Sequence, residues 1–193
     1  MTSTADTPTD LDRLGSQVSL QLAGTYRRRV HASLERIWEN VFDWEHLAHL
    51  HQDSFQACSL IDRGPWGWRV ELTPHGAASQ TIELQANRGD NRYISTTVEG
   101  ADVRTEIRVS LTPVAEHLVD VVVEFLLPET RPDRQAALGA AYTAAYARLW
   151  DEDEAMMQAR ENALSRRNRP DRSSGPLDLG DERAVRANLP MQF

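Results

Sequence analysis

The segment from residue 39 to residue 51 concentrates side chains that can hold a metal or move a proton. Glu39, Asp43 and His46 are spaced by four and three residues, and His51 follows five residues later. On a helix that advances about 100° per residue, the first three lie within about 60° of one another, so two carboxylates and an imidazole share a face. His51 is rotated by about 140° from His46. Both imidazoles can therefore reach one metal only if the helix ends or distorts between them.

A further carboxylate, Asp153, lies on an apolar helical stripe formed by Tyr142, Tyr146, Leu149, Trp150 and Met157. Its acidic neighbours are expected to point elsewhere; they are Asp151, Glu152 and Glu154. A carboxylate on a core-facing stripe is costly unless it is paired or coordinates a metal. Two histidines and one carboxylate with open positions form the facial triad of non-haem Fe(II) sites. We therefore predict His46, His51 and Asp153 as metal ligands.

Metal-free alternatives remain open for these residues. Asp153 could pair with an arginine across the core, for example Arg69 or Arg108. The histidines could be hydrogen-bonded structural residues, or a general acid and base, which needs pKa values near neutrality but no metal. His49 lies between the two histidines and could instead cap the end of the helix, where a cation is favoured.

The spacing Glu39-x3-Asp43-x2-His46-x4-His51 resembles the mononuclear-iron motif of Rieske non-haem iron oxygenase α subunits. Glu152-Asp153, followed by Met156, Met157 and Gln158, is similar to the later helix of these subunits, where the Asp ligand lies. The resemblance covers roughly residues 17–193. It implies that the predicted triad binds Fe(II). It also implies that Glu39 supports the ligands without contacting the metal, and that Asp43 is the carboxylate that bridges the iron to a neighbouring Rieske cluster. It also implies a homo-oligomer, because neighbouring subunits bring cluster and iron together in that family.

The chain departs from that family in its cysteine content. Cys58 is the only cysteine, and even a Rieske centre needs two cysteines and two histidines, so this chain alone cannot hold an iron–sulfur cluster. No CxH…CxxH segment precedes the motif. Electrons for any redox chemistry would have to come from a separate Rieske or ferredoxin partner.

The elements that must position these residues follow from the patterning. Alternation from residue 17 to Val30 predicts a strand, and Ser33 offers an N-cap for a helix through Phe42. Five or six further strands are expected at 55–62, 66–73, 80–87, 91–98, 103–111 and 117–126, and a long Ala-rich helix at 133–167. This order predicts an α+β helix-grip (START/Bet v 1-like) fold, with an antiparallel sheet wrapped around the C-terminal helix and a cavity between them. We expect residues 17–168 to form this domain, 1–16 to be a disordered lead, and 169–193 to be a tail that docks on it.

Composition limits the class of protein. With 40% hydrophobic and 26% charged residues and no long apolar run, we expect a soluble domain without a membrane span. The N-terminus lacks both a basic start and an apolar stretch, which favours a cytoplasmic protein. The net charge of −8, without a single lysine, disfavours nucleic-acid binding.

Two functions are consistent with these observations. The first is an Fe(II) oxygenase-like domain that binds a bulky apolar or aromatic small molecule in its cavity and activates O₂ with electrons from a partner. The alternative is a non-enzymatic lipid- or polyketide-binding helix-grip protein, or a cyclase, in which the triad is a remnant.

Overall fold

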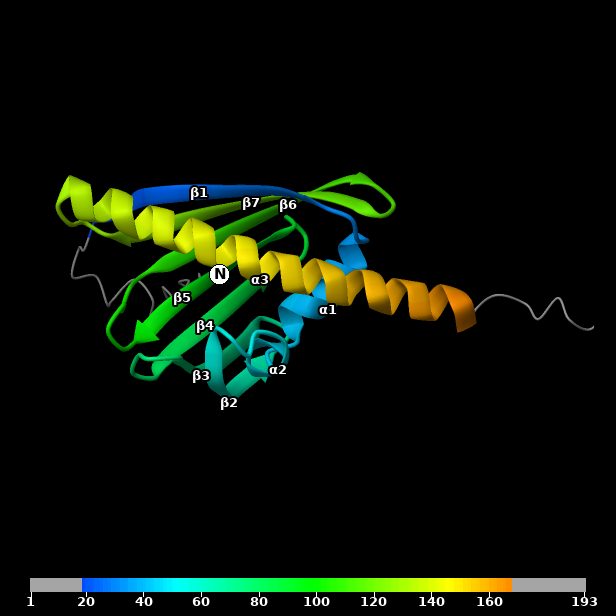
Figure 1. Ribbon diagram of the computed structural model, residues 1–193, viewed down its shortest axis with the longest axis horizontal. Coiled ribbons are helices and arrows are strands. Elements are labelled where there is room, and N and C mark those ends of the chain that lie inside the picture. The colour runs from blue at the N-terminus through cyan, green and yellow to red at the C-terminus, as the bar shows by residue number, and fades with distance from the viewer. Residues whose placement is uncertain (1–18, 168–193) are drawn as a thin grey trace, which may run out of the picture.

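A seven-stranded antiparallel sheet with a long helix lying across one face makes up residues 19–167, the part that the computed structural model describes (Figure 1). The sheet is built from β1 (Leu20–Val30), β2 (Phe55–Gly64), β3 (Gly67–Pro74), β4 (Gln80–Asn87), β5 (Arg92–Glu99), β6 (Glu106–Ala115) and β7 (Leu118–Pro128). The predicted α+β arrangement is confirmed. The predicted lead at 1–16 and tail at 169–193 lie outside the described residues.

The strands follow one another as a meander, in the spatial order β1-β7-β6-β5-β4-β3-β2. β1 pairs with β7 rather than with β2, so the first strand joins the last and β2 forms the opposite edge. Gly67 opens β3 with a φ of +137°, and a Cβ at this position would lie 1.9 Å from the carbonyl oxygen of Leu84. Only glycine fits this turn.

The chain crosses from β1 to β2 through two short helices, α1 (Leu34–Phe42) and α2 (His46–Leu50). The Ser33 side chain caps α1 by accepting a hydrogen bond of 3.3 Å from the backbone N–H of Arg36. α1 ends where the backbone of Asp43 leaves helical geometry, at φ −87° and ψ 85°. The prediction that Glu39, Asp43 and His46 share one helix face is therefore wrong, because this break separates Glu39 from His46.

Helix α3 (Pro132–Arg167) runs diagonally over the concave face of the sheet (Figure 1). Its closest approach is to β1, where a Cβ on Gly139 would lie 2.0 Å from the carbonyl oxygen of Ala23. Gly139 thus allows the helix to pack closely against β1. No helix within residues 19–167 is both long enough and apolar enough to cross a membrane.

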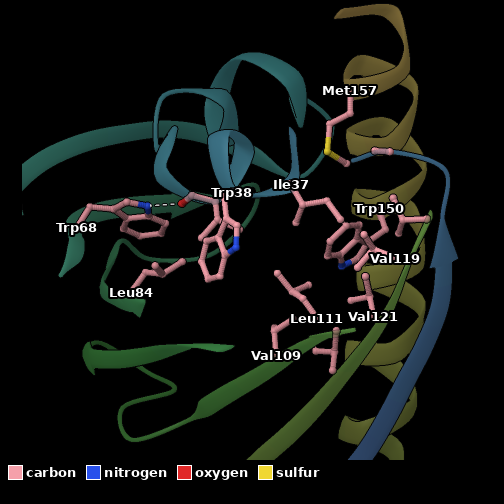
Figure 2. Packing of buried hydrophobic residues seen from close by; sticks show 14 of the residues in the cluster. Ile37, Trp38, Trp68, Leu84, Val109, Leu111, Val119, Val121, Trp150 and Met157 are labelled. Carbon is pink, nitrogen blue, oxygen red and sulfur yellow. Dashed lines mark hydrogen bonds between the residues drawn. The ribbon is translucent and has the colours of Figure 1, made fainter. Parts of the chain in front are cut away.

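The core lies between the sheet, α1 and α3 (Figure 2). Every second residue of β7 faces inward and is buried, as its alternating pattern predicts: Val119, Val121, Val123, Phe125 and Leu127. α1 is tied to the sheet by the indole of Trp68, which donates a hydrogen bond of 2.8 Å to the carbonyl oxygen of Val41, drawn as a dashed line in Figure 2. This bond fixes the position of the α1–α2 junction over the sheet.

Candidate metal centre

His46, His51 and Asp153 meet at one point, with one potential ligand atom from each lying within 4.8 Å of the others. The Nε2 atoms of His46 and His51 lie 3.6 Å and 3.2 Å from the same oxygen, Oδ1 of Asp153. His51 is 1% exposed and Asp153 is 7% exposed. These are the three residues predicted from the sequence, and the structure brings them together.

The ends of α2 explain how two histidines five residues apart converge. His46 is the first residue of this helix and His51 follows its last, with a non-helical φ of −94° and ψ of 47°. The helix thus ends between the two histidines, as the sequence required. Because of that ending, the two imidazole centroids lie 5.2 Å apart instead of on divergent faces.

Hydrogen-bond partners determine which imidazole nitrogen faces the centre. The Nδ1 atom of His51 lies 2.5 Å from Oε2 of Glu152, and Nδ1 of His46 contacts the backbone carbonyl oxygen of Asp43. Both partners are acceptors, so each Nδ1 donates to its partner and each Nε2 faces Oδ1 of Asp153. Metal-ligating histidines in proteins have this arrangement, with the other ring N–H donated to a carboxylate or a backbone carbonyl.

The Oδ1 atom of Asp153 is buried and has no hydrogen-bond partner within residues 19–167, although two imidazole nitrogens lie nearby. Two lone pairs and a carboxylate oxygen that converge in a buried site repel one another unless a cation lies between them. A divalent metal, or a proton on His51, would supply that charge. The residues present therefore fit an Fe(II) ion of the two-histidine, one-carboxylate type.

The electrostatics differ between the two histidines. Burial lowers the pKa of His46 below its usual value, more strongly than the nearby charge of Asp153 raises it. Burial acts on His51 in the same direction, but contacts with Asp153 and Glu152 outweigh it and raise its pKa. Of the two histidines, His51 therefore keeps a proton to the higher pH.

The alternative that Asp153 pairs with Arg69 or Arg108 is wrong, because both arginines have other partners. Arg69 donates to Glu83 at 2.8 Å, and Arg108 donates to Glu106 at 2.6 Å. No arginine in the described part of the chain pairs with Asp153.

The remaining acidic residues of the motif lie outside the triad. Glu39 pairs with Arg36 and, at 3.1 Å, with Arg160, and it contacts neither histidine. The Asp43 side chain is exposed at the end of α1, and only its backbone carbonyl contacts His46. His49 is exposed in the last turn of α2.

The sequence analysis missed two acidic residues next to Asp153. Glu152 was expected to point elsewhere but contacts His51 from one side. Glu154 is 7% exposed, pairs with Arg28 and accepts a hydrogen bond of 2.7 Å from the backbone N–H of His31. The consecutive acidic residues were the available signal, because a long Glu side chain one position from the stripe can still reach a group beside it.

The predicted cavity lies between α3, the α1–α2 segment and strands β3 to β6, and has a volume of about 270 Å³. The triad belongs to its wall together with apolar residues that include Phe55, Trp68, Ile107, Leu149 and Trp150. Asn40 also lines it, and its Oδ1 is buried without a hydrogen-bond partner in the described chain. The expected cavity is therefore confirmed, with the three predicted ligand residues at its surface.

A second, more open pocket of about 480 Å³ lies along the first half of α3, next to the loop between β5 and β6. It contains none of the three ligand residues. Tyr142 and Ala145 line both spaces, so the Tyr142 side chain stands between the outer pocket and the inner cavity.

Comparison with known proteins identifies the fold. The Zhui aromatase/cyclase from Streptomyces sp. R1128 superposes with a TM-score of 0.60 at 12% identity, covering 74% of this chain and 96% of that one. Norcoclaurine synthase from Thalictrum flavum gives 0.56 at 16% identity, with coverages of 75% and 99%. A START superfamily protein from Mycobacterium smegmatis gives 0.52 at 18% identity, with coverages of 68% and 97%.

The fold is a START/Bet v 1-like helix-grip fold. No protein-family model matches the chain, and no curated protein matches its sequence. The comparisons support the helix-grip part of the predicted resemblance and give no support to its Rieske oxygenase part. At these identities the likeness establishes the fold alone.

Proposed function

We propose that this helix-grip protein binds a compact apolar ring compound in its cavity, beside a divalent metal held by His46, His51 and Asp153. One observation carries the proposal: the three ligand residues form part of the wall of an otherwise mainly apolar cavity. A molecule in this cavity would lie against the metal. Small-molecule sites commonly combine an apolar enclosure with a few convergent polar groups in this way.

The size of the cavity favours a compact ligand. Its volume of about 270 Å³ is slightly below the usual range of small-molecule sites, about 300–1,000 Å³. Proteins of the same fold support a ring compound, since norcoclaurine synthase has been solved with dopamine and hydroxybenzaldehyde and another similar structure is an aromatase/cyclase.

The metal is part of the proposal because the residues fit it. Nε2 of both histidines and a carboxylate oxygen of Asp153 would hold it, and Glu152 would keep the proton on Nδ1 of His51. Bound there, Fe(II) would supply a redox-active centre that can react with O₂. The apolar wall would exclude water from the ligand.

A second candidate, an oxygenase, is favoured by the number of ligands. Three protein ligands leave coordination positions open, whereas purely structural metal sites are usually closed by four. In such a reaction one oxygen atom of O₂ enters a C–H bond of the ligand and the other leaves as water. Two electrons from a separate Rieske or ferredoxin partner and two protons from solvent balance it. The exposed Asp43, whose carbonyl contacts His46, marks a point at which such a partner could approach the centre.

The cavity proposal is tested by blocking the cavity. Naphthalene serves as the probe, and its binding is followed by fluorescence. Ala145 lines the cavity, whereas its neighbour Ala144 is exposed on α3 and does not. Ala145→Phe should reduce naphthalene affinity at least about tenfold, and the matched control Ala144→Phe should leave it unchanged. Equal affinities for both variants and the wild-type protein would rule out binding in this cavity.

A further inference from the structure

We infer that Tyr93 and Tyr146 recognise an oxygen atom on the bound ring, so that the ligand class is a phenol or a ring ketone rather than a plain hydrocarbon. The inference rests on the proposed binding of a ring compound in the cavity. It names the chemistry of that compound and two residues that select it.

Both tyrosines line the cavity, Tyr93 from β5 and Tyr146 from α3. They therefore approach it from the sheet wall and from the helix wall. Neither hydroxyl has a hydrogen-bond partner among residues 19–167. Buried tyrosine hydroxyls usually find a partner, so two unpaired hydroxyls in one cavity indicate that the partner belongs to the bound molecule.

Aromatic contacts hold both rings in place. Tyr93 packs edge-on against Trp38, with ring centroids 6.3 Å apart. Tyr146 packs edge-on against Phe125, with centroids 5.0 Å apart. Because Trp38 and Phe125 are core residues, the tyrosine rings are set before a ligand arrives. Such preorganisation reduces the entropy lost on binding.

Both tyrosines line the same cavity as His46, His51 and Asp153. Burial raises the pKa of both tyrosines, and the Asp153 carboxylate raises it further. The two side chains thus remain protonated and able to donate hydrogen bonds. An oxygen atom accepting from them would orient the ligand ring with respect to His46, His51 and Asp153.

The test compares 2-naphthol with naphthalene, two probes that differ by one hydroxyl group, on metal-free protein. Wild-type protein should bind 2-naphthol about tenfold more tightly than naphthalene. Tyr93→Phe and Tyr146→Phe should each weaken 2-naphthol binding about three- to tenfold and leave naphthalene binding unchanged, because each variant loses a hydroxyl and keeps its ring. Tyr26→Phe is the matched control: its hydroxyl accepts from Arg28 at 3.3 Å, outside the cavity, so neither affinity should change.

Four results would overturn the inference. Equal binding of the two probes by wild-type protein would overturn it and leave the cavity proposal standing. Equal losses for both probes in a Phe variant would mean that the hydroxyls maintain the shape of the cavity. A preference for 2-naphthol that appears only after Fe(II) is added would mean that the metal binds the oxygen. Failure of the wild-type protein to bind either probe would overturn the cavity proposal and the inference together.

Discussion

The carboxylate of Glu152 lies 2.5 Å from Nδ1 of His51, on the side of the ring that faces away from Asp153. This contact holds the proton on Nδ1 and leaves Nε2 free for the shared centre. Glu152 contributes no atom to the triad itself. It therefore acts on metal binding through the orientation and basicity of His51.

Removing Glu152 should weaken metal binding without removing a ligand. We expect Glu152→Ala to lower metal affinity about 10- to 100-fold, the usual effect of losing such a supporting group. Titration calorimetry with Fe(II) under anaerobic conditions measures it. Asp151→Ala is the matched control, because Asp151 pairs with Arg28 at the surface. A loss of equal size in both variants would point to a general effect of negative charge on α3.

Replacing Asp153 should separate metal binding from stability. Asp153→Ala should abolish metal binding, yet leave the metal-free protein at least as stable as the wild type at a pH well above the raised pKa of His51, where that imidazole is uncharged. The substitution removes a buried carboxylate with no hydrogen bond to its Oδ1 and strands no arginine. Denaturant melts of both metal-free proteins measure it. A loss of about 3–5 kcal/mol would show instead that Asp153 is a structural ion-pair partner.

Metal-free and metal-bound protein should respond to pH in opposite directions. The pKa of His51 is raised in the metal-free fold, so its contribution to stability is full below about pH 6.5 and is lost as pH rises through the folded pKa. Metal binding requires the unprotonated imidazole, so affinity should fall as pH decreases below that same pKa, approaching tenfold per unit. Melting temperatures with and without metal between about pH 5 and pH 9 test this. Parallel curves would contradict it.

The contact of α3 with β1 depends on Gly139. Gly139→Ala should destabilise the protein by about 1–3 kcal/mol, because the added Cβ would lie 2.0 Å from a backbone oxygen of Ala23 and the helix must shift. Ala140→Ser, at an exposed position of the same helix, is the control and should have little effect. Unchanged stability of Gly139→Ala would mean that the helix has room to move at this point.

The sequence predicted the sheet and the triad because both leave a periodic signal. Inward-facing residues of β7 alternate strictly, and Asp153 interrupts an otherwise apolar helical stripe. The end of α1 at Asp43 left no such signal, since no glycine or proline marks it. Residues 39–46 were therefore predicted to lie on one continuous helix. The contact of Glu152 with His51 depends on where α2 ends in space. Tyr93 and Tyr146 have ordinary strand and helix patterns, and only the structure shows that they line the cavity with hydroxyls that have no partner among residues 19–167.

Metal content after anaerobic loading tests the central claim most directly. Protein incubated with Fe(II) and then desalted should hold about one iron per chain, without iron–sulfur absorption, because one cysteine cannot hold a cluster. His46→Ala, His51→Ala and Asp153→Ala should each retain less than about one tenth of that iron, while His49→Ala retains all of it. Wild-type protein that binds no iron, or triad variants that bind as much as the wild type, would contradict the claim that these three residues form a metal centre.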